Sequence, residues 1–195
     1  MTVFRIGVIL GSTRSTRLSP RIAQYVIDRV RSSEWDISFT LSLIDLKEWD
    51  LPLMDEPKVP ALVTKTEDYE SEVARKWSRE ISSYDGFIFV TPQYNWGYPA
   101  CLKNAIDYLF NEWKGKPAML VSYGGHGGHK CYNQLRQVLE GLDMEVTERG
   151  VLVPYPTKKE VMYGIPADFH FDQLPEIRET IETAFENLLN LLKKN

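Results

Sequence analysis

The sequence predicts an α/β fold in which helices cover both faces of one parallel sheet. Short apolar runs rich in β-branched and aromatic residues, such as Phe87-Ile88-Phe89-Val90, suit strands that are buried on both faces. Amphipathic segments with apolar residues three and four positions apart suit helices. The two kinds of segment alternate along the chain, which is the pattern of repeated strand-helix units. The 195 residues fit a single domain, residues 1–195.

The alternation predicts five strand-helix pairs. We expect strands at residues 3–10, 37–45, 87–90, 117–123 and 145–153, and helices at residues 20–30, 68–83, 99–110, 131–142 and 175–192. Residues 46–63 and 154–173 have no clear period, so we expect long connections there. Right-handed crossovers between parallel strands favour the strand order 2-1-3-4-5. This is the order of a flavodoxin-like three-layer sandwich, with a five-stranded parallel sheet between two layers of helices.

Composition narrows the class of protein. The chain has 43% hydrophobic and 26% charged residues and a net charge of −4, which excludes a disordered chain and argues against nucleic-acid binding. No apolar run reaches the length of a membrane span, so we expect no membrane partner. Two cysteines, Cys101 and Cys131, are too few for a disulfide framework and suit a reducing compartment. We therefore expect a cytoplasmic enzyme.

The loop after the first strand, residues 11–19, has the composition of a phosphate site. It offers hydroxyl groups from Ser12 and Ser19 and guanidinium groups from Arg14 and Arg17, and it ends at a helix N-terminus. It matches neither G-x-G-x-x-G nor G-x-x-x-x-G-K-[ST], so a Rossmann dinucleotide-binding site and a P-loop phosphate-binding site are both disfavoured. The alternative is a polar loop in which Ser19 simply caps an ordinary helix. Its position after the first strand favours phosphate binding.

The loop after the third strand is rich in aromatic and amide side chains. Thr91-Pro92 ends the strand, and the residues that follow are Gln93, Tyr94, Asn95, Trp96, Gly97 and Tyr98. Aromatic faces stack on a planar ring, and backbone N–H groups and amides meet its edge. We therefore interpret this loop as a platform for a heterocycle. A packing loop beneath a neighbouring element is the alternative.

The loop after the fourth strand, residues 124–130, places four glycines around His126. Glycine allows the backbone to approach a ligand closely, which favours a binding loop over a flexible connection. A metal site built from His126, His129 and Cys131 is also conceivable, but their spacing matches no standard zinc pattern and no fourth ligand is evident. We therefore expect no metal.

The three loops follow strands one, three and four, which meet at the switch point of such a sheet. One phosphate site and one ring site without an adenine fingerprint indicate a mononucleotide, and FMN fits better than other common cofactors. Four stretches support this interpretation: GSTRSTRLSP, the segment from Asp45-Leu46 to Leu51-Pro52, TPQYNWGYPACLKNAIDYL and SYGGHGG. They closely resemble the NADPH-dependent FMN reductase family and are most similar to its fungal quinone reductase members.

The resemblance runs from Ile6 to about Val153 and implies a set of FMN-binding residues. The phosphate would be held by Ser12, Arg14, Arg17 and Ser19. The isoalloxazine would be lined on one edge by Pro92, Gln93, Tyr94, Asn95 and Trp96, and on the other edge by Ser122, Tyr123, Gly124, Gly125 and His126. It also implies a homodimer. This agrees with the loop after the third strand, whose aromatic side chains offer more apolar surface than one ligand should cover.

We therefore expect an oxidoreductase that takes hydride from NADPH or NADH and passes two electrons to a quinone by a ping-pong mechanism. A flavin, an azo compound or a metal ion such as ferric iron or chromate could also be the acceptor. Because the cofactor carries the chemistry, we expect no catalytic side chain. An FMN-binding electron carrier or redox sensor with little NADPH turnover is the alternative. A hydrolase using Ser12 or Cys131 with His126 is disfavoured, because the chain has no nucleophile elbow and no evident orienting acid.

Overall fold

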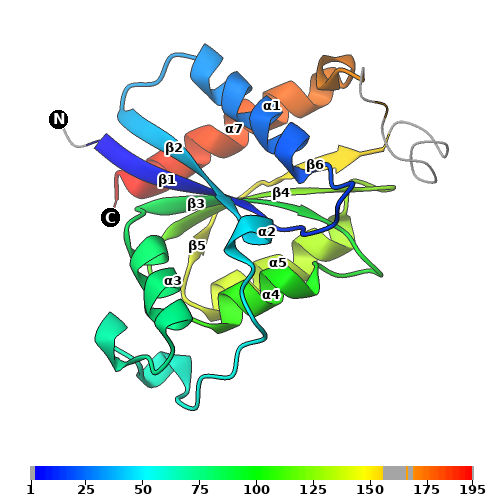
Figure 1. The fold of residues 1–195 in the computed structure, drawn as a ribbon. Helices are drawn as coiled ribbons and strands as arrows, with labels where there is room; N and C mark the ends of the chain where they lie inside the picture. Colours follow the sequence, from blue (N-terminus) through cyan, green and yellow to red (C-terminus); the bar gives the residue numbers. More distant parts are fainter. Residues whose placement is uncertain (1–2, 156–165, 167–168, 195) are drawn as a thin grey trace.

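The computed structural model describes residues 3–155, 166 and 169–194. Its centre is a parallel sheet in the order β2-β1-β3-β4-β5, with β6 also paired to β4 (Figure 1). The strands are β1 (Val3–Leu10), β2 (Ser38–Asp45), β3 (Gly86–Pro92), β4 (Pro117–Gly124), β5 (Glu145–Val146) and β6 (Val151–Pro154). The predicted flavodoxin-like strand order is confirmed.

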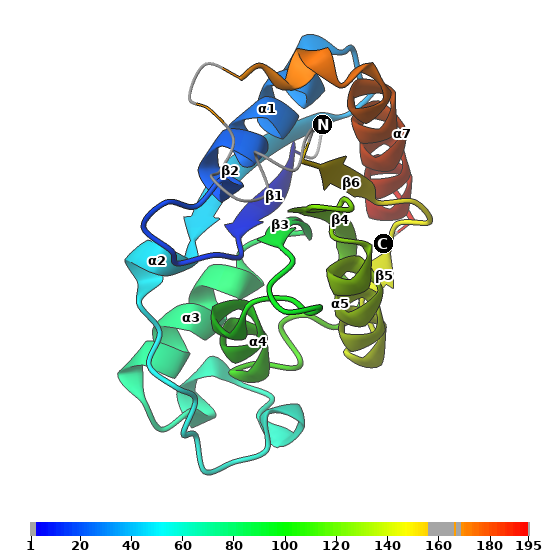
Figure 2. The same ribbon diagram turned by 90° about the vertical axis from the view of Figure 1, so that its right-hand side faces the viewer.

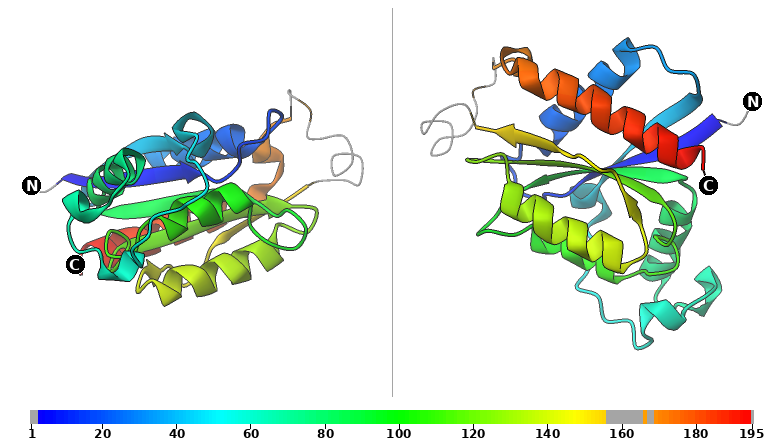
Figure 3. Two further views of the ribbon diagram at one scale, coloured as in Figure 1. Left: turned by 60° about the horizontal axis from the view of Figure 1, so that its bottom comes forward. Right: turned by 180° about the vertical axis from the view of Figure 1, so that it is seen from behind.

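Helices form a layer on each side of this sheet (Figures 1 and 3). One layer holds α1 (Ser19–Ser32) and α7 (Pro175–Leu192). The other holds α3 (Glu72–Ser82), α4 (Ala100–Asp107) and α5 (His129–Gly141), with the short α2 (Leu46–Trp49) at the end of β2. Short 3₁₀ helices lie at Pro60–Leu62, Thr66–Asp68 and Phe171–Gln173.

The central strand β3 joins the two hydrophobic cores. All seven of its residues are buried. Its side chains alternate between faces, so Ile88 and Val90 pack with α1 and α7, while Phe87 and Phe89 pack with α3, α4 and α5. Burial on both faces explains why the strand is apolar without interruption, as the sequence predicted.

The fifth predicted strand, residues 145–153, is divided. Ala118 of β4 faces Val146 and Val121 faces Val151, so four residues, 147–150, lie opposite only two residues of β4, 119–120. The extra residues form a local turn in which the Thr147 hydroxyl donates to the carbonyl oxygen of Arg149. Two short strands therefore replace the continuous one.

Helix boundaries differ from the prediction at several ends. Helix α3 begins at Glu72 because the Ser71 hydroxyl caps it by accepting from the N–H of Ala74. Helix α5 begins two residues earlier than expected, and α4 ends three residues earlier. Most of the irregular connection expected at residues 154–173 lies outside the described residues.

The connection after α2 runs over α4 and is tied to it. Asn104 accepts from the N–H of Met54 at 2.9 Å and donates to the carbonyl oxygen of Pro52 at 2.6 Å. Leu53 nevertheless has 83% of its surface exposed, and Leu62 has 77%. This segment therefore presents apolar side chains to the outside. Figure 2 shows it below α3 and α4, where it projects from the body of the sheet.

Candidate functional site

The loops that follow β1, β3 and β4 meet at the carboxyl edge of the sheet, as the sequence predicted (Figure 2). The Ser12 and Tyr94 hydroxyl oxygens are 2.7 Å apart, which joins the first loop to the second. The N–H of Gln93 donates to the carbonyl oxygen of Tyr123 at 2.9 Å, which joins the second loop to the end of β4. The three predicted loops thus form one connected surface.

Two buried hydroxyl groups lie unpaired behind the first loop. Ser19 is the first residue of α1 and is fully buried, and its hydroxyl has no hydrogen-bond partner among the described residues. The Tyr123 hydroxyl lies close enough to Ser19 to interact with it electrostatically, but the two form no hydrogen bond of normal geometry, and Tyr123 has no other partner among the described residues. Burial raises the pKa of Tyr123, so its hydroxyl stays protonated and able to donate. Buried polar groups are rarely left unpaired, and these two fit an anionic ligand.

Ser19 does not cap its helix. The residue at the cap position is Leu18, and no side chain caps α1. No side chain therefore occupies the start of α1, which is where the phosphate hypothesis places an anion.

Arg17 braces the first loop. Its guanidinium group donates to both carboxylate oxygens of Asp45, one at 2.7 Å, and also to the carbonyl oxygen of Ser12 at 3.0 Å. The Arg17 and Asp45 side chains are only 12% and 14% exposed. Arg17 was expected to hold phosphate. Three of its five N–H groups are engaged with Asp45 and Ser12, so it positions Ser12 and has only its remaining donors to offer an anion.

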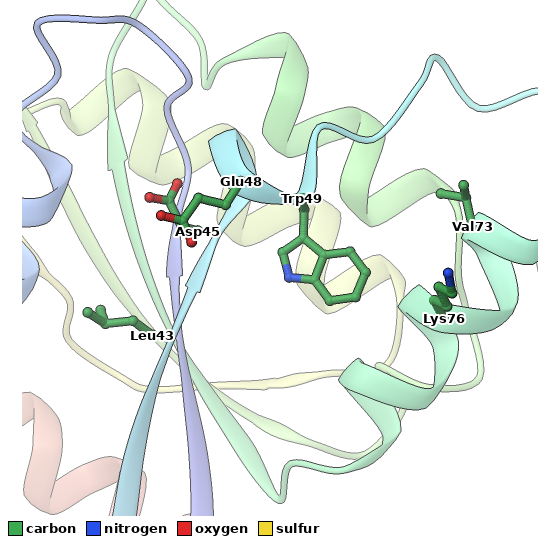
Figure 4. A pocket seen from close by; sticks show the side chains of 6 residues that line it. All are labelled: Leu43, Asp45, Glu48, Trp49, Val73 and Lys76. Atoms are coloured by element: carbon green, nitrogen blue, oxygen red, sulfur yellow. The ribbon is translucent and has the colours of Figure 1, made fainter.

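Asp45 was not predicted as a site residue, yet it holds Arg17 beside the first loop. It is the last residue of β2, and its carboxylate also accepts from the N–H of Lys47 and so caps α2. Figure 4 shows Asp45 and Glu48 pointing away from the Trp49 indole, which faces α3 across a hollow of about 380 Å³. Its place at the carboxyl end of a strand was the available signal.

Arg14 is exposed and has no carboxylate partner in the part of the chain that the structure describes. Its guanidinium carbon lies 5.5 Å from the centre of the Tyr94 ring. Of the two arginines in the loop, Arg14 is therefore the one free to bind an anion bidentately.

The aromatic loop after β3 is a tight hairpin. The N–H groups of Tyr94 and Gly97 each donate to the other residue's carbonyl oxygen, at 2.9 and 3.0 Å. Asn95 and Trp96 between them have positive φ values of 45° and 73°, as a type I′ turn requires. Tyr94 and Tyr98 are half-buried, whereas Trp96 is 67% exposed. The hairpin thus presents backbone groups and the exposed Trp96 indole at the carboxyl edge of the sheet, which is the mouth of the site.

The side chain of Gln93 links this hairpin to α5. Its Oε1 atom accepts from the backbone N–H groups of Lys130 and Cys131, at 3.1 and 3.2 Å, and so caps the first turn of the helix. Gln93 was expected to line the cofactor, and with its amide oxygen engaged here its side chain has a positioning role. Neither this cap nor the position of Lys130 beside the hairpin was predicted from the sequence, because both depend on how closely α5 approaches the hairpin.

The glycine loop is held in a closed turn. The buried Ser122 hydroxyl donates to the carbonyl oxygen of Gly127 at 2.9 Å, and the N–H of Gly127 donates to that of Gly124 at 3.1 Å. Gly125 and His126, the residues at its tip, are exposed. The turn therefore directs its tip outward beside the hairpin.

Comparison with known proteins identifies the family. Residues 4–157 match the family model described as NADPH-dependent FMN reductase. The chain belongs to this family. It is 48% identical over 156 residues to NAD(P)H-dependent FMN reductase LOT6 of Saccharomyces cerevisiae, which covers 78% of this chain and 81% of the relative. It is 34% identical over 153 residues to a quinone reductase of Pseudomonas putida, covering 73% of each chain.

A solved structure supports the fold of the family. FerB, a flavoenzyme NAD(P)H:(acceptor) oxidoreductase from Paracoccus denitrificans, superimposes with a TM-score of 0.69 at 20% identity and covers 98% of each chain. As a member of the NADPH-dependent FMN reductase family, the chain is an NAD(P)H-dependent flavin oxidoreductase with FMN as its cofactor. The unpaired hydroxyl groups of Ser19 and Tyr123 and the free guanidinium group of Arg14 suit the phosphate of that cofactor.

The other chemistries considered for the site find little support. Cys131 is buried, and burial raises the pKa of its thiol to about 12, so it is protonated at neutral pH and a poor nucleophile. Ser12 pairs with Tyr94 and not with a histidine. Among the described residues, no cluster of three His, Cys, Asp or Glu side chains is arranged to hold a metal. None of the helices in that part of the chain combines the length and the apolar character that a membrane span requires.

Replacing Gly128 with alanine is expected to distort the glycine loop. Gly128 has a φ of 75°, and a Cβ atom there would lie 3.0 Å from the backbone N and O of Tyr123. Alanine in this conformation should lower the free energy of unfolding by about 1–3 kcal/mol and weaken FMN binding. Urea unfolding and FMN titration check both effects.

The control is Gly141→Ala, because a Cβ atom at Gly141 meets nothing within 4 Å. This variant should be neutral or slightly stabilising. Equal stability and FMN affinity of Gly128→Ala and Gly141→Ala would show that the close approach at Gly128 is unimportant.

Proposed function

We propose that residues 1–195 form one FMN-binding domain that transfers electrons from NADPH or NADH to quinones or similar flat acceptors, with the two substrates taking turns at one site. The observation that supports it is that hydrogen bonds join the loops after β1, β3 and β4 to one another, so that they form a single mouth at the carboxyl edge of the sheet. A related protein is named a quinone reductase. Flavins, azo compounds and metal ions such as ferric iron or chromate are further candidate acceptors.

Several contacts and exposed groups support a set of cofactor-binding residues. Arg14, Ser19 and Tyr123 would hold the FMN phosphate, with Ser12 kept in place by Arg17. The ring would lie between the hairpin, residues 92–96, and the end of β4 with its glycine loop, residues 122–126. When bound, FMN supplies the capacity to accept hydride and to deliver two electrons. The backbone N–H groups of the hairpin and the glycine loop would orient the ring and stabilise negative charge on its edge.

Steady-state kinetics test this proposal. If NADPH and a quinone occupy the same place in turn, double-reciprocal plots at several quinone concentrations should be parallel, and each substrate should inhibit competitively against the other. Intersecting lines would mean that both substrates bind together and that the single-mouth proposal is wrong. Tight FMN binding with negligible NADPH oxidation would instead favour an electron carrier or redox sensor.

We also propose a homodimer. The exposed apolar side chains of Leu53, Val59 and Leu62 lie on one projecting segment, and Trp96 adds a further exposed ring near the site. Such a concentration of apolar surface is typical of a subunit interface. The cytoplasmic location expected from the cysteine content stays a prediction.

Light scattering at micromolar concentration checks the oligomeric state. The wild-type protein should have the mass of a dimer, and Leu53→Glu combined with Leu62→Glu should shift it to the monomer. Val3→Glu is the control, since Val3 is also exposed but is the first residue of β1 and lies outside the projecting segment. A fully active wild-type monomer would contradict the dimer.

A further inference from the structure

An exposed tryptophan and an unpaired lysine lie together beside the hairpin. The Lys130 ammonium nitrogen is 5.6 Å from the centre of the Trp96 ring, and the indole is 67% exposed. Across residues 3–155, 166 and 169–194, no carboxylate forms an ion pair with Lys130. Lys130 has no part in the FMN site as proposed, so its position calls for another explanation.

Both residues occupy positions that local preferences disfavour. Trp96 has a φ of 73° in a turn where glycine is the usual residue. Lys130 is the second residue of α5, at the end of the helix where the dipole disfavours a positive charge. Residues that break local preferences at the mouth of a site are typical of function.

The order of the strands places this pair away from the FMN phosphate. Strand β3 lies between β1 and β4, so its hairpin separates the loop of β1 from α5. On the side of the β1 loop, Arg14 lies over the Tyr94 ring. On the side of α5, Lys130 lies over the Trp96 ring. FMN has a single phosphate, for which Arg14 and the buried hydroxyl groups suffice. The second cation therefore suits a second anion, which comes with the other substrate.

The chemistry of the pair indicates which part of that substrate it meets. An open indole face stacks on a planar base, and an ammonium group attracts phosphate. In a nicotinamide dinucleotide these two features occur next to each other at the adenosine 2′-phosphate, which NADPH has and NADH lacks. We propose that Trp96 stacks on the adenine ring of NADPH and Lys130 binds its 2′-phosphate, so that Lys130 selects NADPH over NADH. This inference rests on the proposed function.

Donor kinetics at a fixed saturating concentration of 1,4-benzoquinone test the lysine. In Lys130→Ala, kcat/KM for NADPH should fall about tenfold through loss of a charge-assisted contact, and kcat/KM for NADH should stay within about twofold. Lys130→Arg should retain most of the NADPH activity. Trp96→Ala should lower kcat/KM for both donors, because both carry adenine. Lys194→Ala removes the same charge from an exposed position near the C-terminus and is the control.

Calorimetry on the FMN-loaded wild-type protein gives a readout independent of turnover. Adenosine 2′,5′-bisphosphate should bind about tenfold more tightly than adenosine 5′-monophosphate, and the difference should disappear in Lys130→Ala. Equal affinity for the two nucleotides, or equal losses with NADPH and NADH in Lys130→Ala, would overturn the assignment. If the wild-type protein binds FMN and oxidises NADH in either case, only this inference fails and the proposed function stands.

Discussion

Asp45→Ala is expected to destabilise the protein and weaken FMN binding together. The substitution leaves the Arg17 guanidinium group largely buried without its anionic partner, and it frees the loop that Arg17 holds through the carbonyl oxygen of Ser12. Breaking a mostly buried ion pair from one side should lower the free energy of unfolding by roughly 2–4 kcal/mol. FMN affinity should fall about tenfold, because Ser12 is no longer held in place.

Urea unfolding measures the loss of stability and FMN titration measures the loss of affinity. Two further variants serve as controls for these two effects. Lys114→Ala breaks the exposed pair with Asp143 and should change stability by less than about 0.5 kcal/mol. The double variant Arg17→Met with Asp45→Leu should recover much of the stability, since no buried charge is left unpaired, but not the FMN affinity. Wild-type stability and affinity in Asp45→Ala would refute the bracing role of Arg17.

Arg14→Ala is expected to release FMN without unfolding the protein. Arg14 is exposed and makes no ion pair among the described residues, so the apoprotein should lose little stability. Loss of a charge-assisted bidentate contact to phosphate should raise the dissociation constant of FMN by about ten- to a hundredfold. Quenching of FMN fluorescence measures this constant.

Arg178→Ala removes the same charge from the surface of α7 and should bind FMN as the wild type does. The contrast with Asp45→Ala is informative, because that variant should lose stability and affinity at once, whereas Arg14→Ala should lose affinity alone. An unchanged dissociation constant in Arg14→Ala would exclude Arg14 from the phosphate site.

The sequence was sufficient for the architecture because each strand and helix carries its own periodicity. The buried run at residues 87–90 and the prolines at the starts of α1, α4 and α7 are local signals, and right-handed crossovers then restrict the strand order. The break between β5 and β6 was not predictable in this way. It depends on the approach of α5, since the Tyr132 ring packs against Gly150 and leaves no room for a Cβ atom there.

In the candidate site, too, the features that depend on contacts between distant parts of the chain could not be predicted. The three loops could be located because each follows a strand, but the sequence could not distinguish Arg14 from Arg17. That distinction depends on Asp45, which lies 28 positions from Arg17 and reaches it only through the pairing of β1 with β2. The capping role of Gln93 likewise depends on α5, 37 positions further along the chain.

The visible absorption spectrum of the purified protein shows whether the chain binds FMN and passes electrons through it. After incubation with FMN and removal of the excess, we expect bound flavin bands in a ratio of one FMN per chain. These bands should fade on addition of NADPH without oxygen and return on addition of a quinone. A protein that retains no flavin under these conditions, or whose flavin bands do not change with NADPH, would not be an FMN-dependent oxidoreductase of this kind.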